Sequence, residues 1–569
     1  MSLVGVLCVL VVDPSCAGFA GELTLAAEAA FGAVYRPGCP LPVRLTFTNS
    51  ADSVGGELAV TTPGLRYFQP VDLPSPTTRQ IELDAVFFDE KPAVTATITQ
   101  NGEEVFSQTL DLPLRAPAEG EWAVGVLGRE GWAERFRDIR DAAGPAIWGR
   151  ITWLPVGSPQ QYQALDLIVV DASHPRDLPE PPSALIDWLA CGGRLMISLP
   201  AEAGASGPWV NFTRSSITGR RQHPTWRGLS SFPLGLGRVA VVSYGDHEAV
   251  VDPAARKQLA QAIVEALRLR PFPRVGPVQP QLYAALRPVG WTRSDRGHIA
   301  LMVGLYPVLM ALVLLWSGHD RQRWITAIGL SACSGLVVAY LLLMARPQIT
   351  ACTFAVLHTV AGDHHARCDL FAGLGTAKRH LTASVALASG GERFVGPLYY
   401  DWSDVYRLAT DVHPDGTPRL EHLTLSRDTW RCFASWRAML LESPFLVIGG
   451  RLTQPAQLAG NTLTLQDAIV TDGRRAVVLD SIAAESVLEL TDDAVALSEA
   501  VFASLPDDAD GRRDFLQWWT RQPRQPGPWL VGWVPVEAGL SPFDLPAAGQ
   551  PAWMLCTVEL QGEPGAPHP

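Results

Sequence analysis

The amino-acid sequence predicts a chain of several domains, α/β and β in class, with a helical hairpin in a membrane. Three observations favour this class. The length of 569 residues is too great for one hydrophobic core. The apolar fraction of 47% is high beside a charged fraction of 18%, which is typical of a chain with membrane segments. Strand patterns of period two flank a region in which strands and helices alternate.

The first 20 residues are predicted to be a signal peptide. Leu3–Val12 is an uninterrupted apolar run that is too short to cross a bilayer, and the small residues Gly18 and Ala20 follow it as at a cleavage site. The run lacks the positive residues that usually precede it, and a first β-strand of the next domain is the alternative interpretation.

Residues 21–117 are predicted to form an immunoglobulin-like β-sandwich. The stretches LPVRLTFTNS and KPAVTATITQ alternate apolar with polar side chains and are rich in β-branched residues. A length of about 95 residues suits such a domain. The stretch LRAPAEGE, with its Pro and Gly, marks the end of the sandwich.

Residues 118–272 are predicted to form a flavodoxin-like parallel α/β domain. Short apolar stretches (EWAVGVLG, ITWLPV, LDLIVVDA, GRLMISLP and GRVAVVSYG) alternate with helical ones (SPQQYQAL, PPSALIDWLACGG and DPAARKQLAQAIVEALRLR). Continuous apolar strands are typical of a parallel sheet that helices cover on both faces.

Two stretches of this region, LDLIVVDAS and LIDWLACGGRLMIS, resemble the class I glutamine amidotransferase-like fold. The resemblance implies a cysteine nucleophile on a sharp strand-to-helix elbow, activated by a histidine and an acid. Cys191 instead ends a helix, where the negative end of the dipole raises a thiol pKa. The stretch LPAEAG, which follows the next strand, contains no cysteine, and Ser198 has no flanking glycines. We therefore expect a degenerate domain of this fold with no catalytic residue.

Residues 273–298 are predicted to be a Pro-rich linker, and residues 299–345 a transmembrane helical hairpin. Ile299–Trp316 and Trp324–Ala345 carry no charge, and each can cross about 30 Å of hydrocarbon, the first only just. A buried hairpin in a soluble core is the alternative. A hairpin returns the chain to the side from which it came, so the signal peptide predicts a two-pass cell-membrane protein whose large domains are extracytoplasmic.

Residues 346–569 are predicted to form a β-rich domain with a helical insertion. The whole layout resembles a group of uncharacterised bacterial envelope proteins, through LIVVDA, GLYPVLMALVLLW and the stretch GNTLTLQDAIVTDGRRAVVLDSIAAESVLEL. This resemblance implies a location in the cell envelope or periplasm. It implies no particular activity.

Candidate site residues are few. Asp171, Ser173 and His174 follow a central strand, where open α/β sheets bind ligands, although a solvated polar loop is the plainer interpretation. His358, Asp363 and His364 are weak candidates for a metal site, because the adjacent His364 and His365 would point to opposite faces of a strand. The sequence therefore predicts no cofactor and no metal.

The nine cysteines form no CxxC pair. Cys352 and Cys368 are interpreted either as a disulfide across a hairpin or as two separate buried thiols. The formal net charge of −12 argues against nucleic acid as a partner.

The leading functional hypothesis is a non-catalytic, membrane-anchored envelope protein that presents binding or scaffold domains to a protein partner outside the cytoplasm. One alternative is a hydrolase acting on envelope glycans or peptides through Asp171 and His174. A second is a subunit of a membrane transport or assembly complex, in which small hairpin residues such as Gly304 and Gly329 pack against other helices.

Overall fold

The structure of the protein is a computed structural model. It describes 23–62 apart from 33 and 51, 65–87, 92–118, 121–128, 141, 144–172, 178–199, 207–215, 221–222, 229–243, 253–267, 282, 285–286, 349–376, 380–386, 396–398, 410–412, 418–426, 431–482 apart from 449, 486–488, 494–505, 511–521, 528–536 and 552–560.

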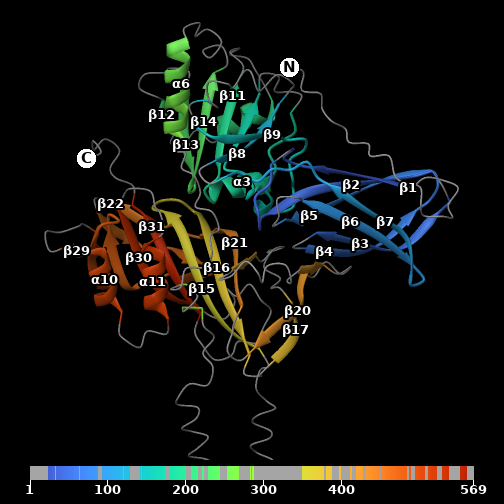
Figure 1. Cartoon of the computed structure of the whole chain (residues 1–569). Coiled ribbons are helices and arrows are strands. Elements are labelled where there is room, and N and C mark those ends of the chain that lie inside the picture. The colour runs from blue at the N-terminus through green and yellow to red at the C-terminus, as the bar shows by residue number, and fades with distance from the viewer. Residues whose placement is uncertain are drawn as a thin grey trace, which may run out of the picture.

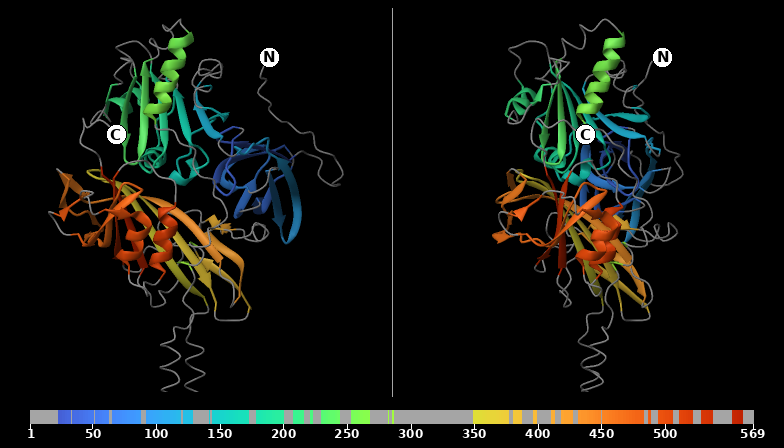
Figure 2. Two further views of the ribbon diagram at one scale, coloured as in Figure 1. Left: turned by 60° about the vertical axis from the view of Figure 1, so that its left-hand side comes forward. Right: turned by 90° about the vertical axis from the view of Figure 1, so that its left-hand side faces the viewer.

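β-Sheets dominate the described part of the chain. Strands account for 57% of it and helices for 16%, so the prediction of a chain in which α/β architecture is prominent is wrong. Four large or medium sheets form three lobes that meet near the centre of the molecule (Figures 1 and 2). We refer to them below as the N-terminal, shared, mixed and long sheets.

The N-terminal sheet and the shared sheet pack face to face in the first lobe. The N-terminal sheet has the order β1-β2-β5, and the shared sheet has the order β17-β20-β19-β4-β3-β6-β7. Alternation explains which residues they bury: Val94, Ala96 and Ile98 of β6 face the core, while the intervening threonines face outward. Their strands are β1 (Leu23–Ala29), β2 (Pro40–Asn49), β3 (Val54–Thr62), β4 (Leu65–Leu73), β5 (Thr77–Val86), β6 (Ala93–Gln100), β7 (Glu103–Asp111), β17 (His380–Ala386), β19 (Thr410–Val412) and β20 (Pro418–Ser426).

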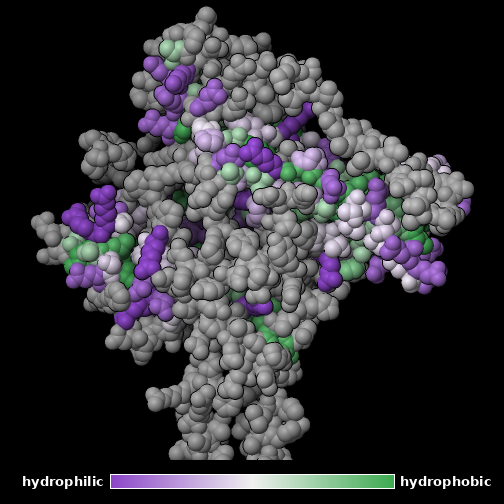
Figure 3. All heavy atoms as spheres, viewed as in Figure 1, coloured by the Kyte–Doolittle hydropathy of each residue, from purple (hydrophilic) through white to green (hydrophobic). Residues whose placement is uncertain are grey.

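The shared sheet takes strands from both ends of the chain. β4 pairs in parallel with β19, so that Thr410 lies opposite Leu65. β17, β19 and β20 therefore extend a sheet that begins with the N-terminal strands, and β17 and β20 lie beneath that lobe in Figure 1. On the surface, the N-terminal strands present a mixture of polar and apolar residues (Figure 3).

The mixed sheet forms the second lobe, with the order β12-β13-β14-β11-β10-β8-β9. Strands β14, β11, β10, β8 and β9 are parallel, and β13 and β12 add to β14 in antiparallel fashion. Its elements are β8 (Trp122–Leu127), β9 (Ala146–Arg150), η1 (Pro159–Tyr162), β10 (Leu167–Asp171), α3 (Ser183–Ala190), β11 (Arg194–Leu199), α4 (Pro208–Ser215), β12 (Arg221–Gln222), β13 (Leu229–Leu234), β14 (Gly237–Ser243) and α6 (Pro253–Ala266).

The prediction of a flavodoxin-like domain does not fit this lobe. The expected strand ITWLPV is a loop, because the strand ends before it, at Arg150. The expected helix SPQQYQAL is reduced to the four-residue 3-10 helix η1, so the connection from β9 to β10 lacks the helix of a doubly wound fold. The antiparallel β12 and β13 also make the sheet mixed rather than parallel.

The long sheet forms the third lobe, with the order β18-β21-β16-β15-β31-β30-β26-β27-β29. Helices α10 and α11 cover one face, where Phe515 stacks on Phe354 with ring centroids 4.7 Å apart. Its elements are β15 (Thr350–Val360), β16 (His365–Gly375), β18 (Gly396–Leu398), β21 (Arg431–Leu440), β26 (Gln466–Thr471), β27 (Arg475–Ser481), β29 (Val495–Ala496), α10 (Leu497–Ser504), α11 (Arg512–Thr520), β30 (Trp529–Val536) and β31 (Ala552–Glu559). Two small sheets lie beside it: β22 (Leu446–Ile448), β23 (Arg451–Gln454) and β28 (Ser486–Val487), and the pair β24 (Gln457–Leu458) and β25 (Asn461–Thr462).

The expected membrane placement needs correction. In the described ranges, none of the helices combines the length and the apolar character that a bilayer crossing requires. The longest of these helices, α6, has 14 residues and spans about 21 Å, which is less than the roughly 30 Å of a hydrocarbon core. The transmembrane helices and the two-pass cell-membrane location with extracytoplasmic domains are therefore not supported. Residues 1–20 and 299–345, to which the signal peptide and the hairpin were assigned, lie outside the described residues.

Candidate functional site

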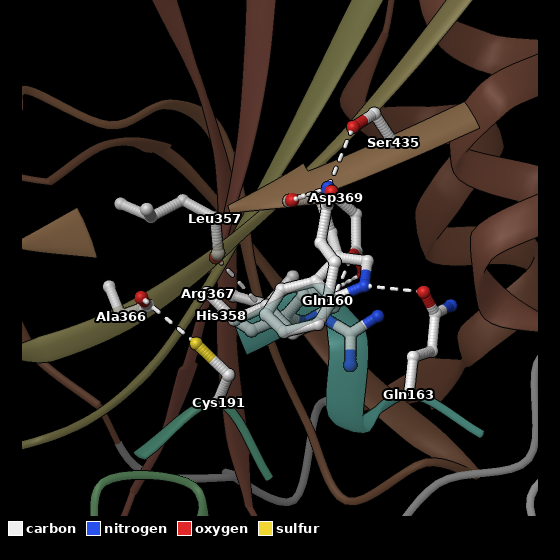
Figure 4. A network of polar contacts seen from close by, with 11 residues as sticks. Gln160, Gln163, Cys191, Leu357, His358, Ala366, Arg367, Asp369 and Ser435 are labelled. Carbon is white, nitrogen blue, oxygen red and sulfur yellow. Dashed lines mark hydrogen bonds and ion pairs between the residues drawn. The ribbon is translucent and has the colours of Figure 1, made fainter. Parts of the chain in front are cut away.

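A network of polar side chains lies where the mixed sheet meets the long sheet (Figure 4). One side of the network comes from η1 and from the end of α3, and the other comes from β15, β16, β21 and β31. We call it the polar junction. Its members are Gln160, Gln163, Cys191, His358, Arg367, Asp369, Ser435, Trp436 and Thr557.

The alternation of β16 places a charged pair on one face of a buried strand. Ala366, Cys368 and Leu370 are buried on one side. Arg367 and Asp369 therefore share the other side, since residues two apart point the same way. The Nε atom of Arg367 donates to Oδ1 of Asp369 at 2.7 Å.

Strand register brings His358 and Thr557 to the same carboxylate. His358 of β15 lies opposite Arg367 in the antiparallel ladder and opposite Thr557 of β31 in the parallel one. Its Nε2 atom is 3.2 Å from Oδ2 of Asp369, and its Nδ1 atom is 2.8 Å from the hydroxyl of Thr557. The carboxylate of Asp369 thus has a cationic or polar partner at each oxygen.

The charges of the junction stabilise one another. Burial by itself would raise the pKa of Asp369, but the Arg367 guanidinium and the hydrogen bond from His358 outweigh it and lower the pKa to about 2. Burial acts to lower the pKa of Arg367, and the Asp369 carboxylate reverses that effect and raises it. In the folded protein, the ion pair therefore stays ionised near neutral pH.

Trp436 joins this pair to the mixed sheet. The guanidinium carbon of Arg367 lies 4.7 Å from the centroid of the Trp436 ring, which is within the range of a cation–π contact. The indole Nε1 of Trp436 donates to Oε1 of Gln163 at 2.9 Å, and Nε2 of Gln160 donates to the Trp436 carbonyl at 2.6 Å and to the Ser435 hydroxyl at 3.2 Å. Gln160 of η1 and Gln163, its C-cap residue, thereby both bond to β21.

The same turn contacts the N-terminal lobe. Ser158 caps η1 in a capping box with Gln161, which fixes the turn locally. The Nε2 atom of Gln161 then donates to Oδ1 of Asp84 on β5 at 2.6 Å. A second link is the pair of Arg36 and Asp166, in which one guanidinium nitrogen lies 2.7 Å from both carboxylate oxygens. All three lobes are therefore joined through polar contacts around η1.

Cys191 ends α3 at this junction. Its backbone N–H bonds to the carbonyl of Asp187, and Gly192 continues the chain with φ +113°, a conformation that favours glycine. The thiol is buried and lies 3.9 Å from the carbonyl of Ala366 on β16. Burial is the main cause that raises its pKa to about 12, so the helix dipole named in the sequence argument is not needed to explain an unreactive thiol.

Thr557, His358 and Asp369 place a hydroxyl, an imidazole and a carboxylate in a row. This is the order of groups in a catalytic triad. The hydroxyl of Thr557 is fully buried and also lies 3.3 Å from the carbonyl of Leu357, to which it donates. A nucleophile needs an approach path for its substrate, and this hydroxyl lies between two paired strands. The arrangement therefore suits structural support.

The predicted pocket residues are not part of the junction. Asp171 is buried at the end of β10, where it lies in register with Ser198 of β11. Ser173 and His174 lie outside the described residues. The structure therefore gives the position of one of the three candidates, Asp171, and shows that it is buried.

The three weak candidates for a metal site take part in three different contacts. His358 is part of the junction, His364 has its Nδ1 atom 3.0 Å from the carbonyl of Leu441, and Asp363 pairs with His365. Over the described ranges, no three side chains of the metal-binding types are grouped so that they could hold an ion. Cys352 and Cys368 are both buried, and no disulfide joins them.

Most residues of the junction, including Arg367, Asp369, Gln160 and Trp436, were not predicted as site residues. One signal was present. Opposite charges two residues apart, within an alternating strand whose other face is apolar, predict an ion pair on the polar face. The partners across the lobes carried no such signal, because Gln160 and Trp436 are 276 residues apart in the chain, and Cys191 and Ala366 are 175 residues apart.

These observations define a class of protein: a multi-lobed, β-rich chain whose sheets are joined by buried polar contacts. A protein family described as a domain of unknown function (DUF8726) matches residues 22–113, which carry the first seven strands. No curated protein matches the chain.

Among solved structures, the chain is similar to a calcium-binding mutant of Bacteroides uniformis beta-glucuronidase 2. The match has 11% sequence identity and a TM-score of 0.14, and it covers 34% of this chain and 25% of that chain. At that score the similarity carries no argument about fold or function. The resemblance to amidotransferase-like proteins stays a prediction.

Proposed function

We propose that this protein is a non-catalytic binding or scaffold protein, which holds its three lobes in a fixed arrangement and presents their loops and outer faces to a partner. The proposal rests on one observation: every reactive group of the junction takes part in a contact that supports the structure. Such a site joins lobes rather than transforming a substrate.

Three groups support this argument. The Cys191 thiol is buried and has a pKa of about 12, so it is protonated at neutral pH. The Asp369 carboxylate has a pKa of about 2 and has partners at both oxygens, which makes it a poor proton acceptor. The Thr557 hydroxyl is fully buried. Catalytic acids, bases and nucleophiles need the opposite combination of access and a pKa near the working pH.

The proposal is tested by assaying the purified full chain for hydrolysis of glutamine, of glycoside substrates and of peptide amides. We expect no turnover above buffer. Iodoacetamide at pH 8 should leave Cys191 unmodified in the folded protein and modify it after denaturation in urea. Turnover that Cys191→Ala or Asp171→Asn abolishes, while the variant stays folded by circular dichroism, would show that the protein is an enzyme.

A second measurement tests the fixed arrangement directly. Small-angle scattering of the wild type should match one arrangement of the lobes, and Arg367→Met should broaden the distribution of distances between them. The matched control is Arg475→Ala, which removes a guanidinium from an exposed pair with Asp472 within the third lobe. Identical scattering from wild type and Arg367→Met would contradict a holding role for the junction.

A further inference from the structure

One helical turn from the segment between α6 and β15 is buried against the long sheet. The amide of Leu286 donates to the carbonyl of Leu282 at 3.0 Å, which closes the turn. Leu282 and Ala285 are each 3% exposed, and Leu286 is fully buried. The sequence predicts a linker here, and these three side chains of it belong to the core of the third lobe.

The spacing of the three residues explains the contact. Positions i, i+3 and i+4 lie on one side of a helical turn, so Leu282, Ala285 and Leu286 form a single apolar face. That face belongs to the same core cluster as Phe354 of β15 and Phe515 of α11. Because a short helix by itself is marginal in water, this packing supplies the stability that one turn lacks.

Gly373 of β16 leaves room for the backbone of the turn. A Cβ atom placed on Gly373 would lie 1.8 Å from the carbonyl oxygen of Leu286, which is far inside van der Waals contact. The φ of Gly373 is not positive, so its own backbone conformation does not require glycine. Glycine is needed here because another segment of backbone approaches the strand closely.

Two further elements enclose the turn. The thiol of Cys352 on β15 lies 3.6 Å from the carbonyl oxygen of Ala285 and donates to it. A Cβ atom on Gly511, the N-cap residue of α11, would lie 3.0 Å from the same oxygen. The backbone of the turn is therefore in close contact with β15, with β16 and with the start of α11.

The turn and the polar junction lie on the same face of the long sheet. Residues opposite each other in a ladder point to one face, and Cys352 lies opposite Gly373 just as His358 lies opposite Arg367. Cys352 and His358 are an even number of positions apart on β15, so they share that face, roughly 20 Å from each other. The second lobe contacts this face at the junction, and the chain that follows its last helix, α6, contacts it again at Gly373.

We propose that Leu282, Ala285 and Leu286 form a latch, which attaches the C-terminal end of the second lobe's segment to the long sheet at Gly373. The second lobe is then held at two points, the polar junction and the latch. Each contact keeps the partners of the other at a high effective concentration, so the docked arrangement is more stable than either contact alone would make it. The inference goes beyond the proposed function, because the latch holds the lobes in the same way in an enzyme.

Thiol labelling of the folded full chain tests the latch. Leu286→Asp places a carboxylate in an apolar contact, where burial of the charge is costly, and should release the turn. We expect N-ethylmaleimide to label Cys352 about tenfold faster in this variant than in the wild type, because the turn no longer covers the thiol. Cys556 is the internal control, since it is fully buried in the core on the opposite face of the long sheet. An equal acceleration at Cys352 and Cys556 would overturn the latch, because it would mean that the whole lobe opens.

Two glycines offer a matched pair of variants. Gly373→Ala places a methyl group against the Leu286 carbonyl and should also accelerate the labelling of Cys352. Gly55→Ala is the control, because Gly55 also lies in a strand, has no positive φ, and would place its Cβ atom 3.7 Å from the nearest atom. We expect wild-type labelling in the control. The same labelling rate in both variants would contradict the contact at Gly373.

A third measurement uses the wild type alone and does not depend on the folding of a variant. The amide of Leu286, which bonds to the Leu282 carbonyl, should exchange with deuterium about a hundredfold more slowly than in an unstructured chain. A Leu286 amide that exchanges at the rate of an unstructured chain would overturn the proposal.

Small-angle scattering tests the two-point attachment. The distribution of distances between the lobes should broaden further when Leu286→Asp is combined with Arg367→Met than in Arg367→Met alone, because the second lobe then loses both contacts. Identical scattering from the single and the double variant would show that the latch does not hold the second lobe. None of these results bears on whether the protein turns over a substrate.

Discussion

The core of the mixed sheet and the polar junction beside it are held together by different forces. In the core, β8 and β10 are buried at every position, and β10 contributes apolar side chains to both faces of the sheet. Ile168 and Leu195 pack towards α3 on one face, while Val169 and Met196 pack towards α6 on the other. The junction has few such contacts and uses an ion pair, two amides and an indole.

The difference teaches how a chain of several sheets fixes their relative positions. Burial of a Val, Leu or Ile side chain contributes about 1.5–3 kcal/mol but has no direction, so it stabilises each lobe without selecting one orientation between lobes. Hydrogen bonds and ion pairs depend on distance and angle. The junction places them where β16, β21 and η1 meet, and there they favour one docking geometry.

The largest expected effect is in the core. Leu195→Ala should lower the free energy of unfolding by about 4 kcal/mol, because it leaves a cavity beneath α3 around a side chain that is fully buried. Urea denaturation followed by tryptophan fluorescence measures the loss. Val156→Ala, at a residue that is 72% exposed, is the control and should change the free energy by less than about 0.5 kcal/mol.

The next effect is at the junction. Arg367→Met should cost about 3 kcal/mol, because it leaves the Asp369 carboxylate with its guanidinium partner removed. The loss should also separate the unfolding of the lobes, so that calorimetry shows two transitions. Arg475→Ala, in an exposed pair, should cost less than about 1 kcal/mol. A single, unsplit transition in Arg367→Met would mean that the junction does not couple the lobes.

Acid should weaken the junction by a smaller amount. Asp369 has a folded-state pKa of about 2 against an ordinary value of 3.8, so its contribution is present above the unfolded value and is lost as pH falls towards 2. A shift of this size corresponds to about 2 kcal/mol. Asp369→Asn should flatten the dependence of the unfolding free energy on pH between 4 and 2. An unchanged slope in that variant would assign the acid sensitivity elsewhere.

The smallest effect is expected at Cys191. Cys191→Ala should change the unfolding free energy by less than about 1.5 kcal/mol, because alanine keeps much of the apolar packing of this small buried side chain and removes one long contact with the Ala366 carbonyl. Stability measurements with Cys191→Ala and the wild type, side by side in urea, test this. A loss as large as that of Arg367→Met would place Cys191 among the residues that hold the lobes together.

Local pattern predicted many strands and two helices of the second lobe. The apolar runs LIVVD and RLMISL are β10 and β11, and the stretches PPSALIDWLACGG and DPAARKQLAQAIVEALRLR contain α3 and α6. Prediction failed where tertiary contacts decide. The stretch SPQQYQAL lacks the length of a helix because Gln160 and Gln161 bond outward, to β21 and to Asp84, and so hold the segment as a tight turn.

The candidate site shows the same limit. Asp171 and His174 stood out because they follow a strand, and Cys191 stood out because cysteine is chemically distinctive. The structure uses Asp171 and Cys191 as buried residues of the lobe and its border. Arg367 and Asp369 share a strand face that alternation predicts, but nothing near them in the chain indicates that Trp436 and Gln160 cover that face.

The sequence by itself determined which segments are strands with one apolar face and which polar residues those strands turn away from their cores. The reason is that side-chain direction repeats every second residue and needs no distant partner. Only the tertiary structure decided that β19 extends the N-terminal strands, that η1 bonds to two lobes at once, and that His358, Asp369 and Thr557 converge. Those contacts join residues far apart in the chain, and their geometry exists only after the sheets have docked.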